Sequence, residues 1–158
     1  MILVILGTWR MPFERPLKEI ESLIISGVIK EKVVVQAGVT KFPSTHMEVH
    51  DFLDKDDFDR LYREASLIIT HAGEGSIILG LQYHKKLITI ARLTKYNEHI
   101  DDHQLDILNV FSPKGYLLAW EDGEKLEDVL NRVEAFVPVP YKFSEDKISE
   151  AIIDFLEK

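Results

Sequence analysis

Two short clusters of glycine, histidine and hydrogen-bonding side chains could carry chemistry. The first, residues 71–76, reads His-Ala-Gly-Glu-Gly-Ser, and the second, residues 97–104, reads Asn-Glu-His-Ile-Asp-Asp-His-Gln. Each follows an apolar run with the length and composition of a buried strand, at residues 67–70 and 87–91. Ligands bind at the carboxyl ends of the strands in an open α/β sheet, so both clusters are expected at one binding edge.

The first cluster has the composition of a phosphate-binding turn. Gly73 and Gly75 allow a tight turn and a close approach of a ligand to the backbone. The helix that follows would present free N–H groups, and Ser76 would add a hydroxyl donor. The carboxylate of Glu74 would repel a diphosphate unless it points away. The alternative is an ordinary strand-to-helix turn, because the sequence matches neither the GxGxxG fingerprint nor a Walker A loop.

The second cluster is open to three interpretations. His99 and His103 are four residues apart and would share one face of a helix, so they could bind a metal ion together with Asp102 or His71. The same residues could be a polar helix start whose acids favour the helix dipole. They could also form a rim of donors and acceptors for a sugar and a ribose. We predict no metal site, because HxxxH spacing alone is common and the HExxH arrangement is absent.

Strand and helix patterns alternate along the chain. Apolar runs predict strands at residues 2–6, 32–36, 47–50, 67–70, 87–91 and 115–119. Apolar residues at helical spacing predict a helix ending near Gly27, further helices at residues 54–65, 76–83, 99–109 and 123–135, and a last one capped by Ser144. In the helix predicted at residues 99–109, Ile100, Leu105, Ile107 and Leu108 are expected to face the core.

This alternation predicts an α/β fold with a doubly wound, mostly parallel sheet. No repeat or linker divides the sequence, so a single domain over residues 1–158 is expected.

The composition excludes several classes of protein. A net charge of −8 argues against a nonspecific duplex-binding surface, so no nucleic-acid partner is expected. The chain has no cysteine, which excludes disulfides and thiolate zinc sites. The sequence shows neither a signal peptide nor an apolar stretch long enough to span a membrane, so a cytoplasmic location is expected.

The two clusters at their observed spacing resemble the glycosyltransferase family 28 C-terminal-domain family. The resemblance rests on residues 70–76, on Asn97-Glu98-His99, and on Asp102-His103-Gln104. Further matching segments extend the likeness over nearly the whole chain: Gly7-Thr8 with Pro12-Phe13, and Gln36-Ala37-Gly38. It is strongest to stand-alone members, the small subunits of bipartite glycosyltransferases. These include the cytosolic subunit of the dolichol-pathway GlcNAc transferase and capsule or exopolysaccharide subunits of the PssE type.

The resemblance implies a Rossmann-like domain that is one half of a GT-B fold and binds a UDP-sugar without a metal or other cofactor. It places Gly73, Gly75 and Ser76 at the diphosphate, with His71 beside them. It implies that His71 and His103 are catalytic. The donor-binding set that it implies comprises Gly7, Thr8, Gly73, Gly75, Ser76, Asn97, Glu98, His99 and Gln104. Many relatives carry a glutamate for the ribose hydroxyls at about the position of Leu79, and a leucine does not supply that contact.

The length of the chain fits one of the two domains that a GT-B enzyme needs. The resemblance therefore implies a heteromer in which a membrane-associated subunit supplies the acceptor site and recruits this chain to the membrane. Two alternatives remain open. The chain could be a non-enzymatic nucleotide-sugar-binding or scaffold subunit, or a small metal-dependent hydrolase that uses His71, His99 and His103.

Overall fold

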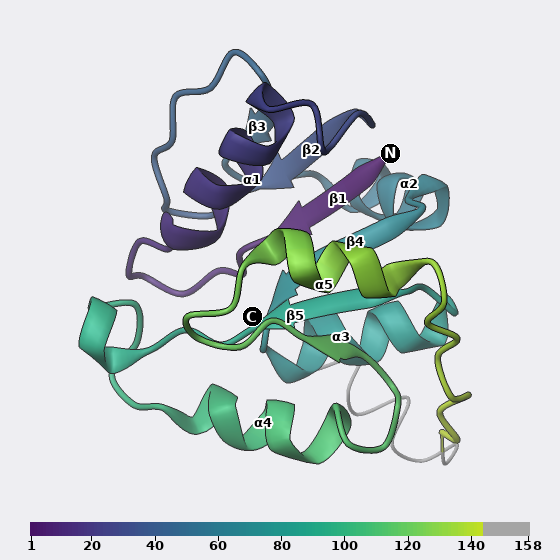
Figure 1. Cartoon of the computed structure of the whole chain (residues 1–158). Coiled ribbons are helices and arrows are strands. Elements are labelled where there is room, and N and C mark those ends of the chain that lie inside the picture. Colours follow the sequence, from purple (N-terminus) through teal and green to yellow (C-terminus); the bar gives the residue numbers. More distant parts are fainter. Residues whose placement is uncertain (144–158) are drawn as a thin grey trace.

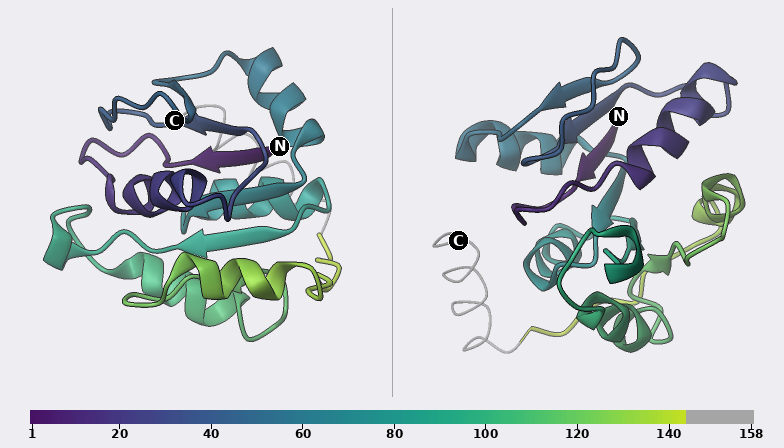
Figure 2. Two further views of the ribbon diagram at one scale, coloured as in Figure 1. Left: turned by 45° about the horizontal axis from the view of Figure 1, so that its top comes forward. Right: turned by 90° about the vertical axis from the view of Figure 1, so that its left-hand side faces the viewer.

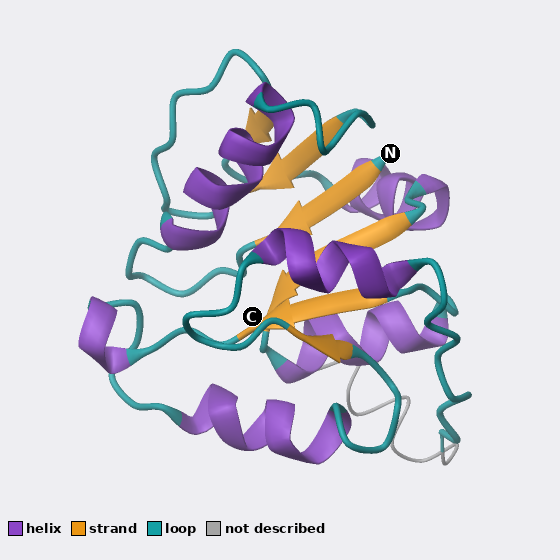
Figure 3. Cartoon of the chain, viewed as in Figure 1, coloured by secondary structure: helices purple, strands orange, loops and turns teal. Residues whose placement is uncertain are grey.

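The structure, a computed structural model, describes residues 1–143 (Figure 1). Six strands form one sheet in the order β3-β2-β1-β4-β5-β6. All neighbouring strands pair in parallel, and their arrows run in one direction in Figure 3. The strands are β1 (Ile2–Ile5), β2 (Val33–Gln36), β3 (Glu48–His50), β4 (Leu67–His71), β5 (Leu87–Ile90) and β6 (Leu118–Ala119). The predicted doubly wound parallel sheet is confirmed.

The centre of the sheet is formed by β1 and β4, which pair from Ile2 opposite Leu67 to Ile5 opposite Thr70. All residues of β1, β2 and β5 are buried. A parallel strand covered on both faces must be apolar along its whole length, which is why these strands read as continuous runs in the sequence. The strand order reverses between β1 and β4, and ligands bind at such a switch point in doubly wound folds.

Helices cover both faces of the sheet, as the two further views show (Figure 2). One face carries α1 (Arg15–Ile25) and α5 (Leu126–Val133), which share a core cluster with alternate residues of the strands. The other face carries α2 (Lys55–Glu64), α3 (Glu74–Gln82) and α4 (His103–Phe111), with a second core cluster. Because the chain passes from a strand to α1 on one face and to α3 and α4 on the other, the loops at the carboxyl edge of the sheet lead to both helical layers.

The second polar cluster departs from the helix predicted at residues 99–109. The helix α4 begins only at His103, and the short 3₁₀ helix η1 (Thr94–Tyr96) precedes a loop through residue 102. His99 therefore lies outside the helix, so the expectation that His99 and His103 share a helical face is wrong. Ile100 and Leu105, expected to face the core, are 63% and 38% exposed, whereas Leu108 is buried as predicted. Side chains hold this loop in a non-helical form: Glu98 accepts from the backbone N–H of Leu93, and Asp102 accepts from that of Thr94.

Other differences concern element ends. The helix α3 starts two residues earlier than predicted, and β6 is confined to Leu118–Ala119 because Gly115 turns the chain with a φ of 74°. The helix expected after Ser144 lies outside the described residues. Within residues 1–143 no helix has the length and apolar character needed to cross a membrane.

The helix α1 allows a test of this packing, because its two faces differ in burial. Ile20 is fully buried in the core cluster, whereas Ile25 on the same helix is 65% exposed. Ile20→Ala should lower the free energy of unfolding by about 2–5 kcal/mol through lost burial and a residual cavity. Ile25→Ala should change it by less than about 1 kcal/mol. Urea unfolding measures both, and equal effects would contradict the packing of α1 described above.

Candidate functional site

Loops that follow β1, β4 and β5 meet at the carboxyl edge of the sheet around the imidazole of His71. Gly7 lies after β1 and Gly73 after β4, and the ring lies between them. A Cβ atom added at either glycine would lie under 3.0 Å from three atoms of the ring. Gly7 also has a φ of 78°, which disfavours any other residue. The glycines predicted as ligand-facing therefore have an intramolecular role, since they make room for a histidine.

His71 is hydrogen-bonded on both sides of its ring. Its Nε2 lies 3.3 Å from Ser76 Oγ, and its Nδ1 lies 3.4 Å from Gln104 Nε2. Burial, assisted by the charges of Arg92 and His99, lowers the pKa of His71 from 6.5 to about 3. The unfolded chain would take up this proton near pH 6.5 and the folded chain only near pH 3, so this group makes the fold less stable as the pH falls through that window.

The first turn of α3 presents unsatisfied donors next to His71. Its N-cap is Gly73, and no side chain caps the N-terminus. The first N–H groups of a helix have no partner within the helix, and the dipole there favours a negative charge. Ser76 is buried in this turn, whereas Glu74 is exposed. This arrangement can bind an anion.

Arg92, directly after β5, is the largest fully buried side chain within residues 1–143. Its guanidinium donates to the carbonyl oxygens of Leu6 at 2.6 Å, Met11 at 2.6 Å and Glu98 at 3.0 Å, and it lies over the ring of Phe13. Burial lowers the pKa of Arg92 to about 10, and the charge of Glu98 opposes that shift. One buried cation thus fastens the loops after β1 and β5 to each other.

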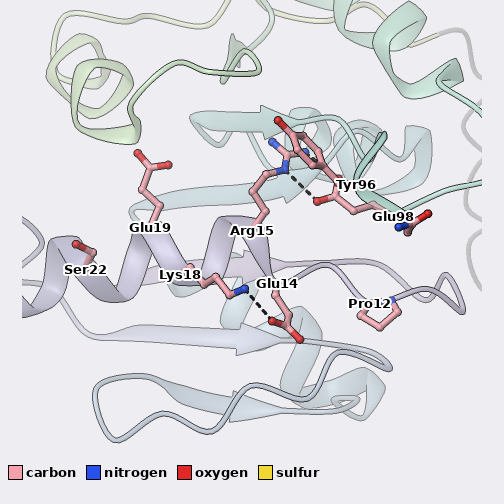
Figure 4. A pocket seen from close by; sticks show the side chains of 9 residues that line it. Pro12, Glu14, Arg15, Lys18, Glu19, Ser22, Tyr96 and Glu98 are labelled. Carbon is pink, nitrogen blue, oxygen red and sulfur yellow. Dashed lines mark hydrogen bonds and ion pairs between the residues drawn. The ribbon is translucent and has the colours of Figure 1, made fainter. Parts of the chain in front are cut away.

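Glu98 joins the same loop to helix α1. Its carboxylate accepts two hydrogen bonds from Arg15, at 2.9 Å and 2.8 Å (Figure 4). It accepts a third from the backbone N–H of Leu93 at 3.0 Å. The side chain is 4% exposed. Both carboxylate oxygens are engaged within the protein, so Glu98 positions the loop. Its expected contact with a donor stays a prediction.

A second group of rings lies in the loop before α4. His99 is buried and stacks on Trp9, with ring centroids 4.4 Å apart, and the ring of His103 meets its edge at 4.8 Å. The Asp101 carboxylate accepts from the backbone N–H of His103 at 3.1 Å and is hydrogen-bonded to the His103 ring, and the backbone N–H of Asp101 donates to Nδ1 of His99 at 3.3 Å. The stack connects the loop after β1 to the start of α4.

Within residues 1–143, one trio of metal-ligand side chains converges: His99, Asp101 and His103, with ligand atoms within 4.8 Å of one another. It differs from the sets considered from the sequence, because Asp101 takes the place expected for Asp102 or His71. The prediction that the chain works without a metal stays a prediction.

The structure brings some of the sequence-predicted residues together and leaves others apart. Gly7, His71, Gly73, Ser76 and Gln104 come together around the imidazole. His99 and His103 form the ring stack, and Glu98 faces Arg15. Gly75 lies within the first turn of α3, and Thr8 and Asn97 are exposed.

An open pocket lies where Asn97 is found, between α1 and η1 (Figure 4). It has a volume of about 810 Å³ and is lined by Pro12, Glu14, Arg15, Lys18, Glu19, Ser22, Tyr96, Asn97 and Glu98. Asn97 and Glu98, from the loop between η1 and α4, belong both to this pocket and to the set of residues predicted from the sequence to bind a donor.

Sequence reasoning missed Arg92, Arg15 and the ring contact of Trp9. A signal for Arg92 was present, because an arginine between Ala91 and Leu93 directly follows a buried strand and is surrounded by apolar residues. Nothing local to Arg15 indicated its partner.

The family assignment follows from the sequence match. The protein-family model described as "Glycosyltransferase family 28 C-terminal domain" matches residues 10–155 of the sequence. The chain belongs to this family. A curated relative, "UDP-N-acetylglucosamine transferase subunit ALG13" of Candida albicans, is 32% identical over 94 residues, which cover 60% of this chain and 30% of the relative. This chain therefore spans less than a third of that relative's length.

Solved structures share the fold. The NMR solution structure of ALG13 superposes with a TM-score of 0.58 at 19% identity and covers 96% of this chain and 93% of that chain. The glycotransferase of kitacinnamycin gives 0.60 at 14% identity over 88% of this chain and 35% of that one. MurG of Acinetobacter baumannii superposes with a TM-score of 0.55 at 14% identity, and the match covers 84% of this chain and 40% of the MurG chain. These matches confirm the Rossmann-like fold that forms one half of a GT-B enzyme.

The Glu98 network yields a stability test. Glu98→Gln should lower the free energy of unfolding by about 2–3 kcal/mol, because the charge-assisted pair is lost and the partly buried charge of Arg15 keeps only the more distant carboxylate of Asp122, at 3.9 Å. Glu14→Gln, which removes only the exposed pair with Lys18, should change it by less than about 1 kcal/mol. Chemical denaturation at pH 7 measures both values. A Glu98→Gln variant as stable as the parent would contradict the positioning role.

Proposed function

We propose that the chain is the donor-binding, catalytic subunit of a heteromeric, inverting glycosyltransferase that uses a UDP-sugar. One observation carries the proposal: His71 and Ser76 lie beside the uncapped N-terminus of α3 at the switch point of the sheet. Membership of the family supports a sugar-transfer role. The printed name of the Candida albicans relative makes UDP-N-acetylglucosamine the first donor to test.

In this proposal the leaving diphosphate accepts hydrogen bonds from the first turn of α3 and from Ser76, and His71 acts on it through its hydrogen bond to Ser76. Fixed donors aimed at the oxygens where charge develops lower the barrier for departure of the nucleotide. Asn97, His99, His103 and Gln104 surround the sugar, and Gly7 and Thr8 border it from the loop after β1. The acceptor hydroxyl still needs a base, which a residue on the partner would supply.

The partner in this proposal is a membrane-associated, acceptor-binding subunit that carries the other half of the GT-B fold. The acceptor is lipid-linked or a polysaccharide, and this chain would act at the cytoplasmic face of the membrane, recruited by that partner. No metal takes part, and the UDP-sugar is a substrate rather than a cofactor.

Binding of the donor can be measured by isothermal titration calorimetry with UDP-N-acetylglucosamine, with and without the partner. Gly73→Ala keeps a compatible backbone, since Gly73 has a φ of −81°, but the new methyl group displaces the His71 ring. Affinity should fall about tenfold or more, which corresponds to about 1.4 kcal/mol. Asn131→Ala on the exposed side of α5 is the control and should bind like the parent.

The same titration tests the metal-dependent alternative. Excess EDTA should leave binding unchanged, and elemental analysis should find no stoichiometric metal. No binding by the parent chain, even with the partner present, would overturn the donor-site proposal. Loss of binding in EDTA would instead favour the trio of His99, Asp101 and His103 as a functional metal centre.

A non-enzymatic scaffold subunit is the second candidate, favoured by Leu79 in place of a ribose-binding acid. Transfer by the reconstituted complex distinguishes the two. His103→Ala should reduce kcat by about tenfold to a hundredfold if His103 contacts the donor. Asp106→Ala, on an exposed position of the same helix, should leave the rate unchanged. Unchanged transfer with His103→Ala would favour the scaffold.

A further inference from the structure

A chain of three hydrogen bonds, which joins four residues, runs through the candidate site with a fixed direction. It starts at the backbone N–H of Arg92, which is 3.0 Å from the side-chain oxygen of Gln104. A backbone N–H can only donate, so the Gln104 atom facing it must be the carbonyl oxygen. Gln104 is 4% exposed, and its amide therefore has one orientation within the protein.

The orientation of Gln104 decides the protonation of the next group. Its NH₂ lies 3.4 Å from Nδ1 of His71. An amide NH₂ donates only, so Nδ1 must offer a lone pair and the single proton of the neutral ring must be on Nε2. A doubly protonated ring would set an N–H group against the amide NH₂.

The last link is Ser76, whose Oγ lies 3.3 Å from Nε2 of His71. The Nε2–H group donates to the hydroxyl oxygen, which leaves the hydroxyl hydrogen free to donate elsewhere. Ser76 is 4% exposed, and among residues 1–143 no acceptor for that hydrogen is found. The chain of donors thus ends on the Ser76 O–H group, in the first turn of α3.

We propose that Gln104 is a positioning residue: oriented by the backbone N–H of Arg92, its amide fixes His71 as the neutral tautomer protonated on Nε2 and so makes Ser76 a hydrogen-bond donor to ligands. The inference deepens the proposed function and rests on it for the ligand, a nucleoside diphosphate. A histidine can act as a fixed hydrogen-bond donor or as a group that takes up and releases protons. A ring held in this neutral form has the first role and not the second.

The charges around the ring agree with this assignment. The groups that act on His71 are the guanidinium of Arg92, from the end of β5, and the imidazole of His99, from the loop before α4. Both disfavour an imidazolium, as does burial, and the pKa of His71 falls to about 3. The neutral ring then persists throughout the range in which enzymes ordinarily work.

Long-range ¹H–¹⁵N correlation spectra of the ¹⁵N-labelled full chain test the inference directly, because the two ring nitrogens of each tautomer give distinct patterns. His71 should show the Nε2–H pattern from pH 8 to pH 5, without titrating. The Nδ1–H tautomer, or an imidazolium at pH 5, would overturn the proposal. The measurement needs neither ligand nor activity.

The variant Gln104→Met tests the cause, since it keeps the length of the side chain and removes both polar atoms. The Nδ1–H form of His71 should then become populated, and UDP affinity should fall about threefold to tenfold. Gln82→Met, a half-buried glutamine on α3, is the matched control and should keep the parent pattern. An unchanged pure Nε2–H pattern in folded Gln104→Met, checked by circular dichroism, would show that Gln104 does not set the tautomer.

Addition of UDP to the parent chain separates this inference from the proposed function. A shift of the His71 Nε2 resonance on binding supports both. An Nε2–H pattern that UDP leaves unchanged supports the tautomer assignment and overturns the donor site.

Discussion

The buried guanidinium of Arg92 is the interaction on which the candidate site depends. Removing a cation from water costs several kcal/mol unless hydrogen bonds replace its hydration. Here three carbonyl oxygens, from Leu6, Met11 and Glu98, replace most of it, and only Nε lacks a partner. Those carbonyls belong to the loops after β1 and β5. If either loop moved away, the buried guanidinium would lose its hydrogen-bond acceptors.

This constraint gives the site its rigidity. The side chain of Arg92 holds the loops after β1 and β5, whereas its backbone N–H orients Gln104 and through it His71. The glycines at 7 and 73 then fit closely around the imidazole. Donors that are already in place do not have to reorganise when negative charge develops, which is the condition under which electrostatic stabilisation is most effective.

The sequence predicted the sheet well because a buried parallel strand leaves few alternatives to a continuous apolar run. It also located the turn at residues 71–76, where glycine and a helix start occur together. It failed at residues 99–102, because the helical spacing of apolar residues there is overridden by side chains that bind backbone N–H groups of the preceding turn. The role of Glu98 was equally hidden, since its partner Arg15 is 83 positions away in the chain and no local pattern indicates such a pair.

The glycines around His71 have a consequence for how such a site can change over time. Neither position 7 nor position 73 can accept a side chain while the imidazole lies between them, so substitutions at these three residues depend on one another. A replacement of His71 by a smaller residue would remove the obstacle at Gly73 at once, but the positive φ of Gly7 would still restrict that position. The first of the two glycines free to vary after such a loss would therefore be Gly73, and a side chain at that position would indicate that the histidine had been lost.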